Sequence, residues 1–153
     1  MITKVLQDRK YQEQQKGQIK DQLMMLVGLV DMFSVSANIE AIKFEPDLPQ
    51  EIKEHFSKFT VFSFANYTFE SIILTEEYIS FEAGFGSDNI GAVVTIPYIA
   101  IFQIIVDDSI LFINPAATMI IKKEIEQRVE EIDQEQRSMN AFKLNSKNKD
   151  LIN

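Results

Sequence analysis

The hydrophobic pattern of the chain changes period near Ile39, and this change restricts the fold more than any other feature of the sequence. Residues 2–34 contain no proline and place apolar side chains at the spacing of one helical face. These apolar residues are Ile19, Leu23, Leu26, Val30 and Phe33. From residue 39 to residue 113, apolar and polar residues alternate, and β-branched and aromatic types predominate. The pattern predicts one long N-terminal helix, with Gly17 as its candidate break, followed by a β-rich body.

Prolines, glycines and an Asp-Asp-Ser turn divide the β-rich body into seven predicted strands. Their ranges are 39–44, 59–65, 71–74, 78–85, 92–96, 100–106 and 109–113. In the fourth strand, one face carries Ile79, Phe81, Ala83 and Phe85, and the other carries Ser80, Glu82, Gly84 and Gly86. One face of this strand is therefore expected in the core and the other is expected to be open. The run from Ile99 to Val106 is apolar on both sides except for Gln103, as in a strand buried within a closed or sandwiched sheet.

A second helix is predicted over residues 118–137, because four apolar residues fall on one helical face. They are Ile121, Ile125, Val129 and Ile132. Residues 139–153 have weak periodicity and many Asn, Lys and Ser residues, which is typical of a mobile tail. The predicted fold class is α+β: an N-terminal helix, a strongly bent antiparallel sheet or small barrel, and a C-terminal helix. Residues 1–138 are predicted to form one domain, since 153 residues are the usual size of a single domain.

Charge and composition narrow the classes of partner. The chain has 23 acidic and 15 basic residues, and its formal charge of -8 disfavours nucleic acid and anionic lipid. It has no cysteine, so thiolate metal sites and cysteine nucleophiles are excluded. The polar start lacks the apolar run of a signal peptide, and the longest apolar stretch, residues 23–30, is far shorter than the roughly 20 residues that cross a bilayer. A soluble, cytoplasmic protein without a membrane partner is predicted.

No residue pattern predicts catalysis. The single histidine, His55, lies in a charged amphipathic stretch, and a surface position is expected for it. Three pairs of adjacent carboxylates occupy turns or a helix surface, where neighbouring side chains diverge: Glu76/Glu77, Asp107/Asp108 and Glu130/Glu131. The glycines between residues 84 and 91 match neither a P-loop nor a dinucleotide fingerprint. The sequence therefore predicts a protein that is not an enzyme and needs no cofactor or metal.

Several short motifs occur in a fixed order between residues 60 and 106. An apolar strand ends at Ala65, an apolar segment covers residues 69–74, the strand end Phe-Glu-Ala-Gly-Phe-Gly-Ser covers residues 81–87, and Thr-Ile-Pro at 95–97 precedes the apolar run at 99–104. This order resembles the stringent starvation protein B family of adaptors for the ClpXP protease. That family has Arg and Gly where this chain has Gly84 and Ser87. It also continues into a long acidic linker with a motif that docks on ClpX, whereas this chain continues into a predicted helix and a short tail.

The resemblance implies a small SspB-like or Sm-like body that binds the C-termini of degradation-tagged (ssrA-type) polypeptides and delivers them to the ClpX unfoldase. The matching peptide-binding positions are Phe81, Glu82, Ala83, Gly84, Phe85 and Gly86. Small residues such as Ala83 and Gly84 allow a peptide backbone to approach a strand closely, and Phe85 can supply an apolar wall. In the alternative interpretation, Ala83 and Phe85 face the core and Gly84 only eases a bend. The residues alone leave both open.

A homodimer through the N-terminal helix is predicted, with Leu23, Leu26, Val27, Val30 and Phe33 at the interface. Apolar residues in this helix exceed one contact face, and the resemblance also implies a dimer. Alternatively, the methionines at 24 and 25 fill gaps in the core. Two other functions stay open: a scaffolding subunit that assembles through this helix, and a small-barrel RNA-binding protein, which the net charge of -8 disfavours.

Overall fold

The computed structural model describes residues 1–120, which form one compact unit. Two helices open it, α1 (Ile2–Leu6) and α2 (Arg9–Leu29). The helical segment breaks at Asp8, not at Gly17 as predicted, because the Asp8 carboxylate caps α2 by accepting a hydrogen bond of 2.9 Å from the Tyr11 amide. Gly17 lies inside α2, where a helix tolerates a single glycine.

The helix also ends earlier than predicted. α2 stops at Leu29, and Phe33 and Ser34 already belong to strand β1 (Phe33–Asn38). This strand was not predicted because Phe33 fits two patterns. It continues the helical spacing from Val30, and it also begins a run in which apolar and polar residues alternate. Phe33, Val35 and Ala37 are buried in the core, but burial does not alternate along the strand, since Ser36 and Asn38 are buried as well.

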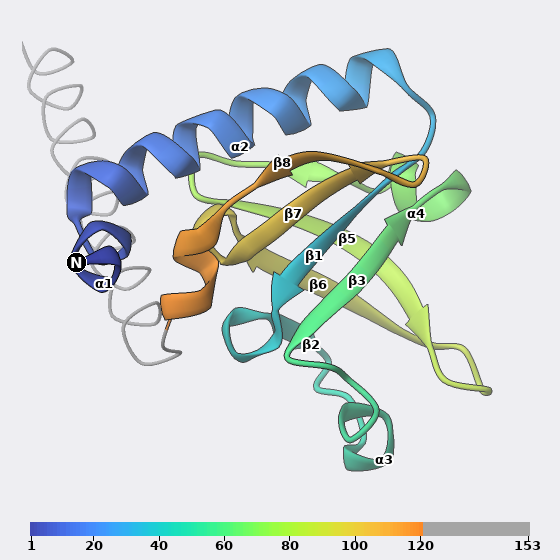
Figure 1. The fold of residues 1–153 in the computed structure, drawn as a ribbon. Helices are drawn as coiled ribbons and strands as arrows, with labels where there is room; N and C mark the ends of the chain where they lie inside the picture. Colours follow the sequence, from blue (N-terminus) through green and yellow to red (C-terminus); the bar gives the residue numbers. More distant parts are fainter. Residues whose placement is uncertain (121–153) are drawn as a thin grey trace, which may run out of the picture. The chain divides into compact units, whose positions relative to one another are not determined.

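Eight strands in residues 1–120 form two antiparallel sheets, which are visible in Figure 1. In spatial order, the first sheet contains β3 (Phe59–Phe64), β1, β7 (Ile101–Val106) and β8 (Ser109–Ile113). The second contains β2 (Lys43–Glu45), β6 (Ile90–Pro97), β5 (Tyr78–Phe85) and β4 (Ile73–Leu74). The α+β class and the N-terminal helix are thus confirmed. Of the two predicted forms, a strongly bent sheet or a small barrel, the barrel is wrong, because the strands form two sheets that do not close.

Two short 3-10 turns explain why one bent sheet becomes two. η1 (Ile39–Ala41) separates β1 from β2, and η2 (Tyr98–Ala100) separates β6 from β7, so the chain changes sheet at both turns. Asn38 fixes the first corner: its side chain accepts from the Glu40 amide at 3.1 Å and donates to the Ala117 carbonyl at 3.0 Å. Pro97 has no amide hydrogen to continue a ladder, and it precedes the second corner.

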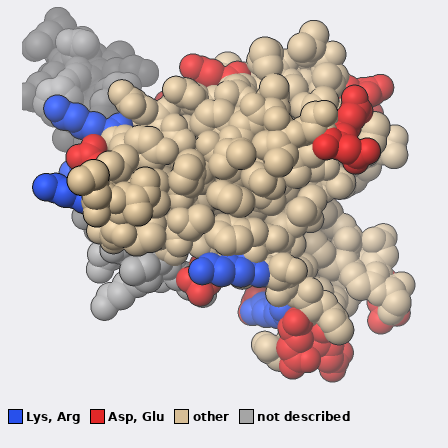
Figure 2. Space-filling view, viewed as in Figure 1, with Lys and Arg blue, Asp and Glu red and all other residues tan. Residues whose placement is uncertain are grey.

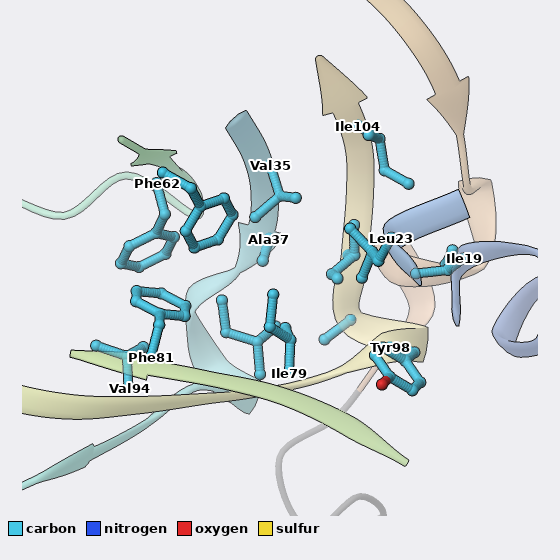
Figure 3. Close-up of a cluster of buried hydrophobic side chains, with 14 of the residues drawn as sticks. Ile19, Leu23, Val35, Ala37, Phe62, Ile79, Phe81, Val94, Tyr98 and Ile104 are labelled. Atoms are coloured by element: carbon cyan, nitrogen blue, oxygen red, sulfur yellow. The ribbon is translucent and has the colours of Figure 1, made fainter. Parts of the chain in front are cut away.

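The core lies between the sheets, and Figure 3 shows its central side chains. Phe81 of β5 meets the ring of Phe64 of β3 edge to face, with ring centroids 4.7 Å apart. Helix α2 adds Ile19 and Leu23, which are fully buried, and it covers one flank of the two sheets (Figure 1). Burial of each such side chain stabilises the fold by about 1.5–3 kcal/mol.

The remaining strand predictions differ in accuracy. β5 and β8 have the predicted bounds, and β3, β6 and β7 differ from prediction by one or two residues. The strand predicted at 39–44 is instead η1 followed by β2, and only Ile73–Leu74 of the segment 71–74 is strand. Besides β1, η1 and η2, three further elements were not predicted: α3 (Gln50–Lys53), α4 (Asn66–Glu70) and η3 (Pro115–Met119).

Most of the C-terminal predictions fall on residues after 120, outside the described part of the chain. The predicted helix at 118–137 begins inside η3, and its residues from 121 onward lie outside the described part of the chain, as do the domain limit at 138 and the tail at 139–153. Among the helices of residues 1–120, none combines the length and the apolar character needed to span a bilayer.

Candidate functional site

A groove of about 530 Å³ lies on the outer face of the second sheet. Its floor consists of Glu82–Gly84 in β5 and residues 91–93 in β6. Tyr67 and Thr68 of α4 line one side, and Glu45 and Pro46 at the end of β2 line the opposite side, with Asn89 of the β5–β6 turn also in the lining. The groove therefore draws together four separate segments of the chain.

Two glycines leave the floor without side chains. Gly84 and Gly91 are direct partners in the β5–β6 register. A Cβ atom added to Gly91 would meet no atom within 4 Å, so the space above it is open. A Cβ atom on Gly84 would lie 1.8 Å from Oδ1 of Asn89, which shows that the Asn89 side chain lies over Gly84. Asn89 has a φ of 50°, a left-handed conformation that Asn tolerates in turns.

Strand β5 has an open edge next to the groove. β4 pairs only with Ile79 and Ser80, so no strand of residues 1–120 pairs with the rest of β5 on that side. The Glu82 amide points to this side and donates to Oγ of Ser71 at 2.9 Å. Because backbone direction alternates along a strand, the N–H and C=O groups of Gly84 point to the same side. Gly84 thus presents main-chain groups at the edge and belongs to the groove floor.

Two carboxylates flank Val93 in the groove. Both Glu82 and Glu45 are register partners of Val93, so the three residues form one row across β5, β6 and β2. Neighbouring strands lie about 4.8 Å apart, which puts the two glutamate backbones about 10 Å apart. Glu45 pairs with Lys43 at 2.7 Å, whereas Glu82 accepts a hydrogen bond from the Tyr67 hydroxyl. This hydrogen bond and the Glu82 charge raise the pKa of Tyr67, so the phenol stays neutral beside the carboxylate.

The six predicted peptide-binding residues divide into three groups. Glu82, Ala83 and Gly84 line the groove. Phe81 is buried in the core, and Phe85 packs on Phe44 with ring centroids 5.6 Å apart, so neither ring faces the groove. Gly86 begins the β5–β6 turn with a φ of 74°. Ala83 packs against the core on the same side of β5 as Phe81, as the alternative interpretation of this strand had it.

Several groove residues were not predicted. Tyr67, Glu45 and Pro46 come from segments that are distant in sequence, and no local pattern connects them with β5. The place of Gly91 could have been predicted from the sequence. If residues 84–91 form a hairpin that turns at Gly86–Asn89, Gly91 lies opposite Gly84, as the structure shows.

The predicted dimer residues also need correction. Leu23, Leu26 and Phe33 are buried in the core of the single chain, so a partner subunit cannot contact them, and Val27 and Val30 are partly buried against the same core. The apolar side chains that this region exposes are Met24, Met25, Leu29 and Met32.

The other residues singled out in the sequence have structural roles or are exposed. Glu76 pairs with Lys20 at 2.8 Å, Asp107 adopts a φ of 49° in the β7–β8 turn, and His55 is exposed. Glu130 and Glu131 lie outside the described residues. In residues 1–120, no group of three or more His, Asp or Glu side chains is arranged to hold a metal ion.

The outer face of the first sheet is a second exposed surface. Figure 2 shows that charged side chains surround this face and that its centre carries none. Ser34 and Ser63 share a hydrogen bond of 3.1 Å there, and β8 exposes Ile110, Leu111 and Ile113. Comparison with protein-family models, with curated proteins and with solved structures yields no match to the chain.

Proposed function

We propose that the protein is a non-enzymatic adaptor that binds the extended C-terminal segment of degradation-tagged polypeptides in the groove beside β5 and brings them to the ClpXP protease. The observation that carries the proposal is the open edge of β5 at Gly84, next to a floor formed by two paired glycines. An extended peptide can add to such an edge through main-chain hydrogen bonds, while side-chain pockets supply specificity.

Two features of the groove suit a peptide backbone. At Gly91 no Cβ atom separates an incoming chain from the strand, and the space above this residue is open. The exposed side chains of Asn89 and Glu82 supply an amide and a carboxylate at the same floor, so backbone groups of a ligand that do not pair with β5 have polar partners nearby. Delivery to ClpX and the nature of the tag rest on the resemblance of residues 60–106 to the adaptor family.

The experiment is a fluorescence-anisotropy titration of the full chain with a labelled degradation-tag peptide. The control peptides have the same composition in scrambled order. A second series carries N-methyl groups at alternate backbone positions, which removes single amide donors without changing any side chain. Saturable binding that falls when one alternating set of amides is methylated supports strand addition. Equal binding of the tag and the scrambled peptides, or equal tolerance of both methylation sets, contradicts it.

A scaffolding subunit is the second candidate function. The exposed apolar side chains of the α2 region and the uncharged outer face of the first sheet favour it (Figure 2). Large exposed apolar patches mark interaction surfaces in soluble proteins. Stable oligomers in sedimentation, together with no retention of any tagged peptide, would favour this function over the adaptor. RNA binding is tested by a titration at low salt, where a protein with a net charge of -8 is expected to show no affinity.

A further inference from the structure

Glu82 is an acidic group in the groove whose one observed partner is neutral. The Tyr67 hydroxyl donates to Oε2 of Glu82, and no lysine or arginine of residues 1–120 forms an ion pair with this carboxylate. Its counterpart across the floor, Glu45, already has the Lys43 ammonium at 2.7 Å. The two carboxylates therefore differ: Glu45 is compensated by a cation within the chain, and Glu82 is not.

An aromatic ring stands beside this carboxylate. Tyr67 is 66% exposed, and its hydroxyl contact with Glu82 holds the phenol ring next to the carboxylate at the edge of the groove. A planar guanidinium can form two hydrogen bonds with a carboxylate and stack on an aromatic face at the same time. An ammonium can make the ion pair but has no planar surface to stack. The pair of Tyr67 and Glu82 is thus suited to arginine more than to lysine.

The floor beside Glu82 limits which ligand residues can lie next to an arginine bound at Glu82. Gly84 follows Glu82 on the same face of β5, and Gly91 lies opposite Gly84, so neither strand adds a side chain of its own to the floor at this point. The Asn89 side chain over Gly84 takes up the room at the turn end of the floor. A ligand residue that faces this end has to be small, since the Asn89 side chain leaves little room there.

We infer that the groove selects extended peptides in which an arginine, placed on Glu82 and Tyr67, is followed or preceded by small residues beside Gly84 and Asn89. This inference rests on the proposed function, because it specifies the ligand of the same groove. Charge complementarity identifies the occupant: the groove lining contains two glutamates and no lysine or arginine.

The test uses the full chain and four labelled peptides that are identical except for one central residue, which is Arg, Lys, Gln or Glu, flanked by alanines. The Arg peptide is expected to bind about three- to tenfold more tightly than the Gln peptide, given the size of exposed ion pairs and cation–π contacts. The order should be Arg, Lys, Gln, Glu, and raising the salt concentration should compress the differences.

Three variants assign the preference to residues. Glu82→Gln keeps the size of the side chain and should make the Arg and Gln peptides bind equally, whereas Glu82→Lys should reverse the order of the Arg and Glu peptides. Tyr67→Leu should bring the affinities of the Arg and Lys peptides together. The control is Glu13→Gln on α2, which removes the same charge from a residue outside the groove and should leave the Arg-to-Gln ratio unchanged. Circular dichroism checks that each variant is folded.

The outcomes separate this inference from the proposed function. Equal affinity of the wild type for all four peptides overturns the arginine preference and leaves strand addition intact. A preference for arginine that persists in Glu82→Gln also overturns it, because the preference then arises elsewhere. Failure of every peptide to bind, including the degradation tag, overturns both.

Discussion

Gly84 of β5 lies directly opposite Gly91 of β6, and the two glycines differ in what surrounds their missing side chains. The space over Gly91 is empty to beyond 4 Å, whereas Oδ1 of Asn89 occupies the Cβ position of Gly84. A Cβ atom at position 91 would therefore enter the groove without touching the protein. This difference makes Gly91 the position at which bulk can be added most cleanly.

We expect Gly91→Gln to block peptide binding and to leave the fold intact. The new side chain would occupy the open floor, so the affinity for the tag peptide should fall by at least about tenfold, or 1.4 kcal/mol. The free energy of unfolding should be unchanged or should rise by up to about 1 kcal/mol, because glycine is unfavourable inside a strand. Anisotropy titration and thermal unfolding measure the two effects. Gly17→Gln is the matched control, since position 17 also has no atom within 4 Å of an added Cβ but lies in α2. Undiminished binding by Gly91→Gln would exclude the groove as the binding site.

Ala83→Gln is expected to act in the opposite way, although Ala83 is adjacent to the same floor. Ala83 packs against the core on the side of β5 that carries Phe81, so the amide would enter an apolar layer. Overpacking costs about 1–3 kcal/mol, and an unsatisfied buried amide costs a similar amount. Chemical denaturation should show this loss of stability before any effect on peptide affinity can be measured. If the variant instead keeps wild-type stability and loses the peptide, the Ala83 side chain faces the groove.

The sequence predicts only part of the groove. The alternation of β5 was sufficient to place Glu82 and Gly84 on the open face and Phe81 in the core. It could not supply Tyr67 or Glu45, because the first depends on the packing of α4 against β5 and the second on the β2–β6 register. The groove is a product of long-range pairing, which local periodicity does not encode.

The fold was predictable to a similar degree. Strands with clear alternation and turn residues at both ends, such as β5 and β8, were predicted with their observed bounds. Strand β1 was missed because its first residue, Phe33, satisfies two periods at once. The division into two sheets depends on η1 and η2: residues 39–41 were predicted as strand, and the break predicted between residues 96 and 100 was not expected to change the sheet.

Asn114 is expected to be critical for stability, because it is fully buried and links four elements, α2, η2, β7 and η3. Its Nδ2 donates to the carbonyls of Ile99 and Ile101 at 2.9 and 3.0 Å, and its Oδ1 accepts from Nε2 of Gln15 and from the Ala116 amide, each at 3.2 Å. Asn114→Ala would leave these buried groups without partners and should cost about 2–4 kcal/mol. Urea denaturation measures the loss. The control is Asn89→Ala at an exposed turn, where strain at positive φ is the main expected cost. If Asn114→Ala loses less stability than Asn89→Ala, the prediction is wrong, because water must then satisfy the buried groups that Asn114 binds.

Tyr98 is expected to make the protein less stable in alkali. Burial, and then the negative charges of Glu76 and Glu77, raise the pKa of the Tyr98 phenol above its ordinary value. The phenol also donates a hydrogen bond of 2.6 Å to the Thr75 carbonyl. The unfolded chain loses this proton first as the pH rises through about 10, so the native state loses stability from there upward and keeps it in full below. Tyr98→Phe should cost about 1 kcal/mol at neutral pH through the lost hydrogen bond and should flatten the alkaline decline. Urea denaturation across this pH range tests it, and an equally steep decline in the variant would contradict the assignment.

The predicted homodimer can now be tested at residues that the chain exposes. Leu29 is 70% exposed near the end of α2, whereas Leu26, one turn earlier, is 2% exposed and belongs to the core. If the α2 region forms the subunit interface, Leu29→Glu should convert the dimer to a folded monomer, because a charge would enter an apolar contact at little cost to the single chain. Leu26→Glu should unfold the chain by burying an unpaired carboxylate. Analytical ultracentrifugation at micromolar concentration, combined with circular dichroism, separates the two effects. Val61→Glu is the control, since Val61 is 58% exposed on β3 in the first sheet. A wild-type chain that sediments as a monomer would refute the dimer, and a Leu29→Glu variant that remains dimeric would move the interface away from α2.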